Sequence, residues 1–99
     1  MKINKTQNGA ELTVSLEGQL DTTTAPELES ALEGLGGVTS LVIDITKLDY
    51  ISSAGLRVLL VAQKNLEKNG GSLTVVGVNE DVKEIFEVTG FDEILNIKA

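Results

Sequence analysis

Two adjacent hydroxyl groups, on Ser52 and Ser53, precede a run of apolar residues with helical spacing, "AGLRVLL". A serine before the first turn of a helix is a favoured N-cap, because its side-chain oxygen accepts a hydrogen bond from a free backbone N–H. That role accounts for one of the two serines. The other is a candidate for phosphorylation, since a phosphate at a helix N-terminus meets free N–H groups and the positive end of the helix dipole.

Carboxylates near the serines would make a phosphate there consequential. Asp21 and Asp44 each follow a segment with the pattern of a strand, and we expect both to point toward the same rim; Asp49 lies just before the serines. A phosphate adds about 1.5–2 negative charges. At roughly 6 Å and an effective dielectric constant of about 20, each unit charge would repel a carboxylate by about 3 kcal/mol. Electrostatic contacts of that size are enough to dissociate a protein complex without refolding either partner.

Gly55 falls in the first turn of the predicted helix, where glycine costs about 1 kcal/mol relative to alanine. This cost indicates that another backbone or a partner approaches closely there. Arg57 lies one turn beyond Ser53. We interpret it as a solvated residue of the helix face, and contact with a partner or with a phosphate is the alternative.

Other chemistries find little support in the residue types. The chain has no histidine and no cysteine, which excludes a Ser-His-Asp triad and a thiolate metal site. Glu80 and Asp81 are better explained as first-turn acids of a helix than as metal ligands. The "GLGG" stretch at residues 34–37 ends a helix instead of opening one, so it is no phosphate-binding loop. A phosphoacceptor-aspartate receiver would need an acidic pair after its first strand, which is missing.

The composition indicates one soluble domain spanning residues 1–99, with 41% apolar residues and a net charge of −7. Eight scattered lysines and arginines argue against a nucleic-acid partner, which needs clustered positive charge. No run approaches the roughly 20 apolar residues of a membrane span, and the N-terminus lacks the apolar core of a signal peptide. We therefore expect a cytoplasmic protein with no cofactor, and not an enzyme, because no side chain titrates naturally near neutrality.

The strands that would position these residues follow from two hydrophobic patterns. Residues 1–7 read as an edge strand with Ile3 inward. Residues 11–18 alternate as a half-exposed strand, with Leu12, Val14 and Leu16 on the inward face. The apolar runs at 40–45 and 72–78 predict strands buried on both faces. A last short strand is expected at residues 93–97.

Three helices separate the later strands. Thr24 and Glu27 have the spacing of a capping box, with Pro26 in the first turn, and glycines at 34–37 end that helix. Asn79 is the expected cap of the third helix, which stops at Gly90. Apolar spacing predicts the buried side of the second and third helices: Leu56, Leu59, Leu60, Gln63, Leu66, Val82, Ile85 and Phe86. The order β-β-α-β-α-β-α-β predicts a single α/β domain with a small, mixed, mostly parallel sheet flanked by helices.

Three segments carry a resemblance to a known family: "GQLDTTTAPEL", "LVIDITKLDYISSAGLRVLL" and "GVNEDVKEIFEVTGFDEIL". With nearly the whole chain, they resemble the STAS domain of bacterial anti-sigma factor antagonists. The resemblance implies a protein that binds an anti-sigma factor which is also a serine kinase, and thereby frees a sigma factor. Phosphorylation of a serine on the antagonist dissociates the complex, and a metal-dependent serine phosphatase resets it.

The same resemblance assigns residues. The family commonly reads Asp-Ser-Ser/Thr-Gly-Leu, and alignment on Gly55 and Leu56 makes Ser53 the phosphoacceptor. Ser52 stands where the aspartate is usual and is a possible second acceptor. Asp21 and Asp44 match aspartates that follow strands. The implied partner-binding residues are Asp21, Asp44, Ser52, Ser53, Gly55 and Leu56, with Ile51 and Leu56 as candidates for an exposed apolar patch.

Two other functions stay open at this point. A constitutive STAS scaffold of a larger sensory or transport-associated assembly would keep the fold and lack the phosphorylation switch. A small-molecule or nucleotide binder has less support, because the chain has no phosphate cradle and only three aromatic residues (3%) for stacking.

Overall fold

The computed structural model describes residues 1–98. In chain order its elements are β1 (Lys2–Asn8), β2 (Glu11–Leu20), α1 (Ala25–Ala31), β3 (Ser40–Ile51), α2 (Ser53–Lys68), β4 (Ser72–Val76), α3 (Glu80–Thr89), the 3₁₀ turn η1 (Phe91–Glu93) and β5 (Asn96–Lys98). This order confirms the predicted succession of strands and helices.

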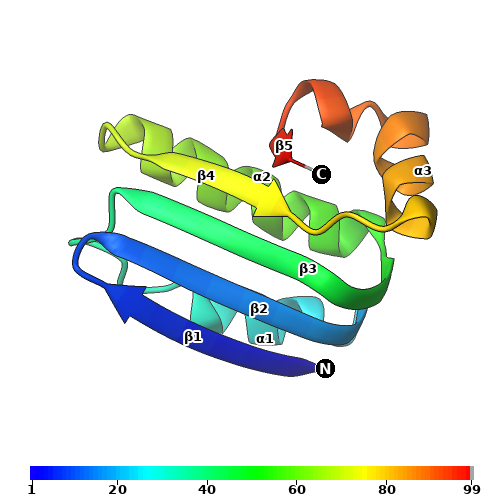
Figure 1. The fold of residues 1–99 in the computed structure, drawn as a ribbon, viewed down its shortest axis with the longest axis horizontal. Coiled ribbons are helices and arrows are strands. Elements are labelled where there is room, and N and C mark those ends of the chain that lie inside the picture. The colour runs from blue at the N-terminus through cyan, green and yellow to red at the C-terminus, as the bar shows by residue number, and fades with distance from the viewer. Residues whose placement is uncertain (99) are drawn as a thin grey trace.

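The strands form one mixed sheet in the order β1-β2-β3-β4-β5 (Figure 1). The β1–β2 pair is antiparallel, and the other three pairs are parallel. Each parallel pair requires a crossover, which α1, α2 and the segment of α3 and η1 provide. The mostly parallel sheet predicted from the sequence is therefore confirmed.

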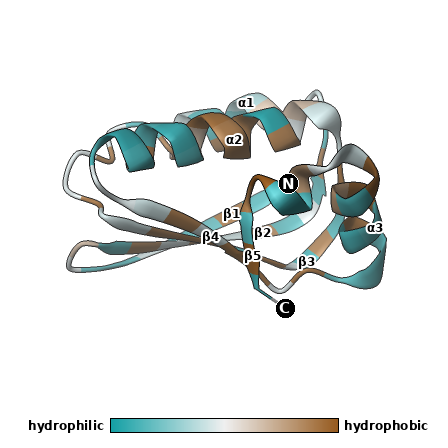
Figure 2. Ribbon diagram, turned by 90° about the horizontal axis from the view of Figure 1, so that it is seen from above, coloured by the Kyte–Doolittle hydropathy of each residue, from teal (hydrophilic) through white to brown (hydrophobic). Residues whose placement is uncertain are grey.

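Helices α1 and α2 lie side by side over the same face of the sheet (Figure 2). The core fills the space between that face and the helices, and aliphatic side chains from β2, β3 and α2 dominate it. The only aromatic ring among the fully buried side chains within residues 1–98 is that of Phe86. The predicted inward residues Leu12, Val14 and Leu16 are each exposed by 2% or less.

The expectation that β3 and β4 are buried on both faces is wrong. Burial alternates along both strands, and Val42, Thr74 and Val76 are half-buried where their neighbours are fully buried. The reason is that α1 and α2 cover one face only (Figure 2). Small polar and β-branched side chains on the second face tolerate this exposure.

Helix α1 departs from its prediction at both ends. It ends at Ala31 with Leu32 as C-cap, before the glycines. The Thr24 side chain makes no capping hydrogen bond to the helix. Its hydroxyl donates to the carbonyl of Gln19 at 2.8 Å and accepts from the N–H of Asp21 at 2.8 Å. The capping box is therefore wrong, because this hydroxyl is used to close the loop that precedes the helix.

The other two helices start as predicted. The Ser52 and Asn79 side chains accept hydrogen bonds from the first turns of α2 and α3, and Gly90 ends α3 in the left-handed region. Gln63 lies on the buried side of α2, exposed by only 9%. Within residues 1–98 none of the helices combines the length and the apolar character needed to cross a lipid bilayer.

Candidate functional site

The candidate site forms where β2 and β3 end side by side. Leu20 and Ile51 are register partners at the ends of the two strands, and the N–H of Ser52 donates to the carbonyl of Leu20 at 2.8 Å. Asp21 and Ser52 are the residues that directly follow these two strand ends. The parallel pairing therefore delivers Asp21 and the two serines to the same edge of the sheet, as the sequence predicted for Asp21.

The two serines have different environments. Ser52 has extended backbone, and its Oγ accepts a hydrogen bond from the N–H of Gly55 at 3.4 Å, so it is the N-cap of α2. Ser53 is the first residue of α2, and its side chain is exposed. One hydroxyl is thus engaged in the fold while the other faces solvent at the positive end of the helix dipole.

Gly55 is where α2 touches the sheet most closely. A Cβ added to it would come to 2.5 Å from Cγ of Leu20 and 3.1 Å from Cγ1 of Ile51. Real Cβ atoms essentially never come as close as 2.5 Å to another heavy atom, so only glycine lets the first turn of α2 rest on the ends of β2 and β3. The predicted close approach at Gly55 is confirmed, and its partner is the protein's own core.

The carboxylate of Asp21 is held by the threonines that follow it. Its Oδ1 accepts hydrogen bonds from the Thr23 hydroxyl at 2.7 Å, the Thr23 N–H at 2.9 Å and the Thr24 N–H at 3.1 Å. These donors, led by the Thr23 hydroxyl, lower the pKa of Asp21 below its ordinary value of 3.8. Asp21 is therefore a fixed negative charge at neutral pH. The "DTTT" sequence is typical of such turns, and this signal was missed.

Asp44 does not join this group. β3 continues from Asp44 to Ile51 and does not end at Asp44 as expected. At about 3.3 Å per residue the intervening strand is ~20 Å long. Asp44 accepts from the hydroxyl and the N–H of Thr46, which lower the pKa of its carboxyl. It also stands between the buried Ile43 and Ile45, so its side chain belongs to the uncovered face of the sheet.

The apolar patch expected at Ile51 and Leu56 is wrong. Each side chain is only 1% exposed, because both pack into the core beneath the start of α2. Gly55 is buried as well. Leu56 and Gly55 therefore support the site by packing, while Ser53 and the half-buried Asp21 present polar groups at the surface.

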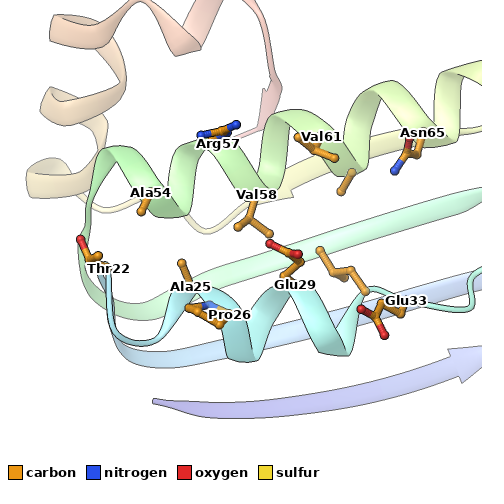
Figure 3. A pocket seen from close by; sticks show the side chains of 12 residues that line it. Thr22, Ala25, Pro26, Glu29, Glu33, Ala54, Arg57, Val58, Val61 and Asn65 are labelled. Atoms are coloured by element: carbon orange, nitrogen blue, oxygen red, sulfur yellow. The ribbon is translucent and has the colours of Figure 1, made fainter.

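An apolar groove that the sequence did not reveal lies between α1 and α2. It encloses about 600 Å³ and starts beside the serines, at Thr22 and Ala54 (Figure 3). The available signal was a set of small or apolar residues outside the predicted buried side of α2. The groove is lined by Thr22, Ala25, Pro26, Glu29, Leu32, Glu33, Ala54, Arg57, Val58, Val61, Ala62 and Asn65.

Residues 1–98 contain no group of three or more acidic side chains arranged to hold a metal ion. The polar groups at the start of α2 are the exposed hydroxyl of Ser53, the capping side chain of Ser52 and the ionised carboxylate of Asp21. This set offers an exposed nucleophilic oxygen for modification by another protein and a surface for binding it.

Comparisons with known proteins agree with this geometry. The model of the STAS domain matches residues 2–99. BtrV of Bordetella bronchiseptica is 35% identical over 99 residues, which cover 98% of this chain and 85% of that protein. The anti-sigma-B factor antagonist of Listeria monocytogenes is 33% identical over 87 residues, which cover 86% of this chain and 76% of that protein.

Solved structures give the same result for the fold. The crystal structure of an anti-sigma factor antagonist from Mycobacterium paratuberculosis superposes with a TM-score of 0.84 at 26% sequence identity, over 97% of this chain and 83% of that chain. Because the family model spans nearly all of the sequence and the relatives are similar over most of their own length, this chain belongs to the STAS domain family.

Proposed function

We propose that this protein is a non-enzymatic anti-sigma factor antagonist whose binding is switched by phosphorylation of Ser53. In its unphosphorylated form it binds an anti-sigma factor that is also a serine kinase, and a sigma factor is released. Relatives named as anti-sigma factor antagonists, among them the protein of Listeria monocytogenes, support the antagonist role.

The observation that supports the proposed switch is that the two serines have different roles in the structure. Ser52 caps α2, whereas Ser53 is exposed at the first helical position. A kinase can reach the Ser53 hydroxyl without disrupting the cap. The phosphate would lie beside unpaired N–H groups of the first helical turn, which tolerate it well. Phosphorylation is therefore expected to change the charge of the surface and to leave the fold intact.

Asp21 gives the phosphate its effect. This carboxylate is ionised at neutral pH and lies at the same edge of the sheet, since Leu20 and Ile51 are register partners. An added charge of about −1.5 to −2 beside it concentrates negative charge on the surface that the partner would cover. A partner surface that accommodates the charge of Asp21 alone would be repelled by the combined charge of Asp21 and phosphorylated Ser53. A metal-dependent serine phosphatase would restore the binding form, and the proposed setting is the cytoplasm.

In this proposal Asp21, Ser52 and Ser53 meet the partner, while Gly55 and Leu56 hold the start of α2 against the core. Asp44 has no direct part in the Ser53 contact, because ~20 Å of strand separates them. Any contribution of Asp44 to binding would be a separate contact on the uncovered face of the sheet.

The experiment that tests the proposal is phosphosite mass spectrometry of the protein purified from its own cells, in growth and under stress, together with the variants Ser53→Ala and Ser52→Ala. We expect phosphate on Ser53 that varies with conditions, and none in Ser53→Ala. Ser53→Asp should release the anti-sigma factor. Phosphate on Ser52 alone would overturn the assignment of Ser53. No phosphate in any condition, with a partner still co-purifying, would favour a constitutive scaffold.

A further inference from the structure

We propose that the groove between α1 and α2 is a docking site for a basic amphipathic segment of the anti-sigma factor, separate from the contact at Ser53. This inference rests on the proposed function, because it takes the anti-sigma factor as the occupant. It adds a second contact that would set affinity, whereas the Ser53 end would set the response to phosphorylation.

Four of the six lining residues that α2 contributes are apolar, namely Ala54, Val58, Val61 and Ala62. Ala25 and Ala54 turn their methyl groups toward one another across the gap between the helices, and Val58 points into it (Figure 3). The small side chains leave the space that larger residues would fill. Val61 remains 50% exposed although it is a large apolar residue. Together with Val58 and the two alanines it lines one continuous apolar surface. A contiguous apolar surface of this kind is a candidate interaction site.

The charge of the α1 wall selects a basic occupant. Glu29 lies on α1 and Glu33 lies just beyond the end of that helix. Both are exposed, and Glu29 points from α1 toward Val58 (Figure 3). Arg57 is the one cation of the lining, so the two carboxylates leave the lining with a net negative charge. A segment with lysines or arginines beside an apolar stripe would match both walls.

The groove has the length of a short helix. Its α2 wall runs from Ala54 to Asn65, which at 1.5 Å per residue is ~16 Å. An amphipathic segment of about three turns fills that length and buries its apolar stripe against Val58 and Val61. A small polar molecule would leave most of this apolar surface in water.

The groove is continuous with the switch. Thr22 and Ala54 line the groove, and they are the sequence neighbours of Asp21 and Ser53. A partner that covers the Ser53 hydroxyl therefore stands next to the groove and can extend a segment along it without leaving the surface.

The test compares two exposed valines on helices, only one of which lines the groove. Val61 is 50% exposed on α2, and Val88 is 80% exposed on α3, away from the groove lining. The dissociation constant for the anti-sigma factor kinase is measured by calorimetry for the wild type, Val61→Glu and Val88→Glu. We expect Val61→Glu to weaken binding roughly tenfold or more and Val88→Glu to change it less than about twofold.

A second pair of variants tests the charge. Glu29→Lys with Glu33→Lys should weaken binding and make it less sensitive to salt, because attraction to a basic segment is screened by ions. Glu84→Lys with Glu87→Lys on α3 makes the same change in net charge on exposed residues outside the groove. This control should keep affinity within about threefold.

The outcomes separate this inference from the proposed function. Wild-type affinity in Val61→Glu, with phosphorylation of Ser53 and release intact, would overturn the docking site alone. A wild type that does not bind the kinase would overturn the proposed function. Self-association of the wild type that is lost in Val61→Glu, with unchanged kinase affinity, would identify a second copy as occupant and likewise overturn the inference.

Discussion

Gly55 and Leu20 approach each other so closely that a Cβ on Gly55 would come to 2.5 Å from Cγ of Leu20 and 2.8 Å from its Cδ2. Leu20 is completely buried at the end of β2, so its side chain has no free space to move into. This contact joins the first turn of α2 to the sheet. It thereby fixes the position of Ser53 relative to Asp21.

The contact predicts that Gly55→Ala destabilises the protein although alanine favours helices. Overpacking a core typically costs about 1–3 kcal/mol, and the gain in helix propensity offsets about 1 kcal/mol of that. We therefore expect the free energy of unfolding in urea to fall by up to about 2 kcal/mol. Gly36→Ala is the control, because its Cβ would meet no atom within 4 Å. Equal stability of the two variants would contradict the proposed contact.

The ionised state of Asp21 predicts a dependence on pH. The pKa of Asp21 lies below 3.8 in the folded state because the Thr23 hydroxyl and nearby N–H groups stabilise the carboxylate. A carboxylate whose pKa is lower in the folded state than in the unfolded state contributes its full stabilisation at pH values above the unfolded-state pKa. That contribution is lost as the pH falls through the folded-state pKa. The stability difference between wild type and Asp21→Ala should therefore shrink as the pH falls below 3.8.

The source of the shift is tested by removing one hydroxyl. In Thr23→Val the pKa of Asp21, followed by carboxyl NMR titration, should move up toward 3.8, because the hydroxyl that lowers it most is gone. Thr22→Val removes a hydroxyl that makes no hydrogen bond to Asp21 in the structure, and it should leave the titration unchanged. A pKa that is the same in both variants would show that the turn backbone alone determines it.

How far the sequence predicts this site depends on whether the pattern is local. The hydrophobic alternation of β2, the caps at Ser52 and Asn79 and the glycine at Gly55 are local signals, and the structure confirms each of them. The antiparallel edge strand followed by parallel pairs also follows from the order and length of the segments.

The wrong predictions concern which side chains are buried by neighbouring helices. Apolar runs at β3 and β4 are typical of strands buried on both faces, yet α1 and α2 pack on the same face and leave the other uncovered. Ile51 and Leu56 are apolar in either environment, so composition could not tell core from surface. The groove depends on the short α1 meeting small residues of α2, which is a tertiary contact with no periodic signature.

Substitutions at Ser52 test the role of the cap separately from the switch. The hydrogen bond from Gly55 N–H to Ser52 Oγ is long, at 3.4 Å, so Ser52→Ala should cost only about 0.5–1 kcal/mol of stability. Ser52→Asp should keep or raise stability, because aspartate caps well and complements the helix dipole. Thermal and urea unfolding measure both variants. A Ser52→Asp protein less stable than Ser52→Ala would contradict a capping role.

Asn79 makes two hydrogen bonds that can be separated by substitution. Its Oδ1 accepts from the N–H of Val82 at 2.9 Å and caps α3, while its Nδ2 donates to the carbonyl of Leu48 at 2.8 Å. The second bond ties the start of α3 to the long extension of β3. Asn79→Asp keeps the cap and loses the donor, whereas Asn79→Ala loses both.

We expect Asn79→Asp to lower the free energy of unfolding by about 1 kcal/mol and Asn79→Ala by about 2 kcal/mol. Hydrogen exchange distinguishes the two bonds. In both variants the amides of the β3 extension around Leu48 should exchange faster, because the tether is lost. The first-turn amides of α3 should exchange faster in Asn79→Ala only. Unchanged exchange around Leu48 in Asn79→Asp would mean that the amide of Asn79 does not hold the extension in place.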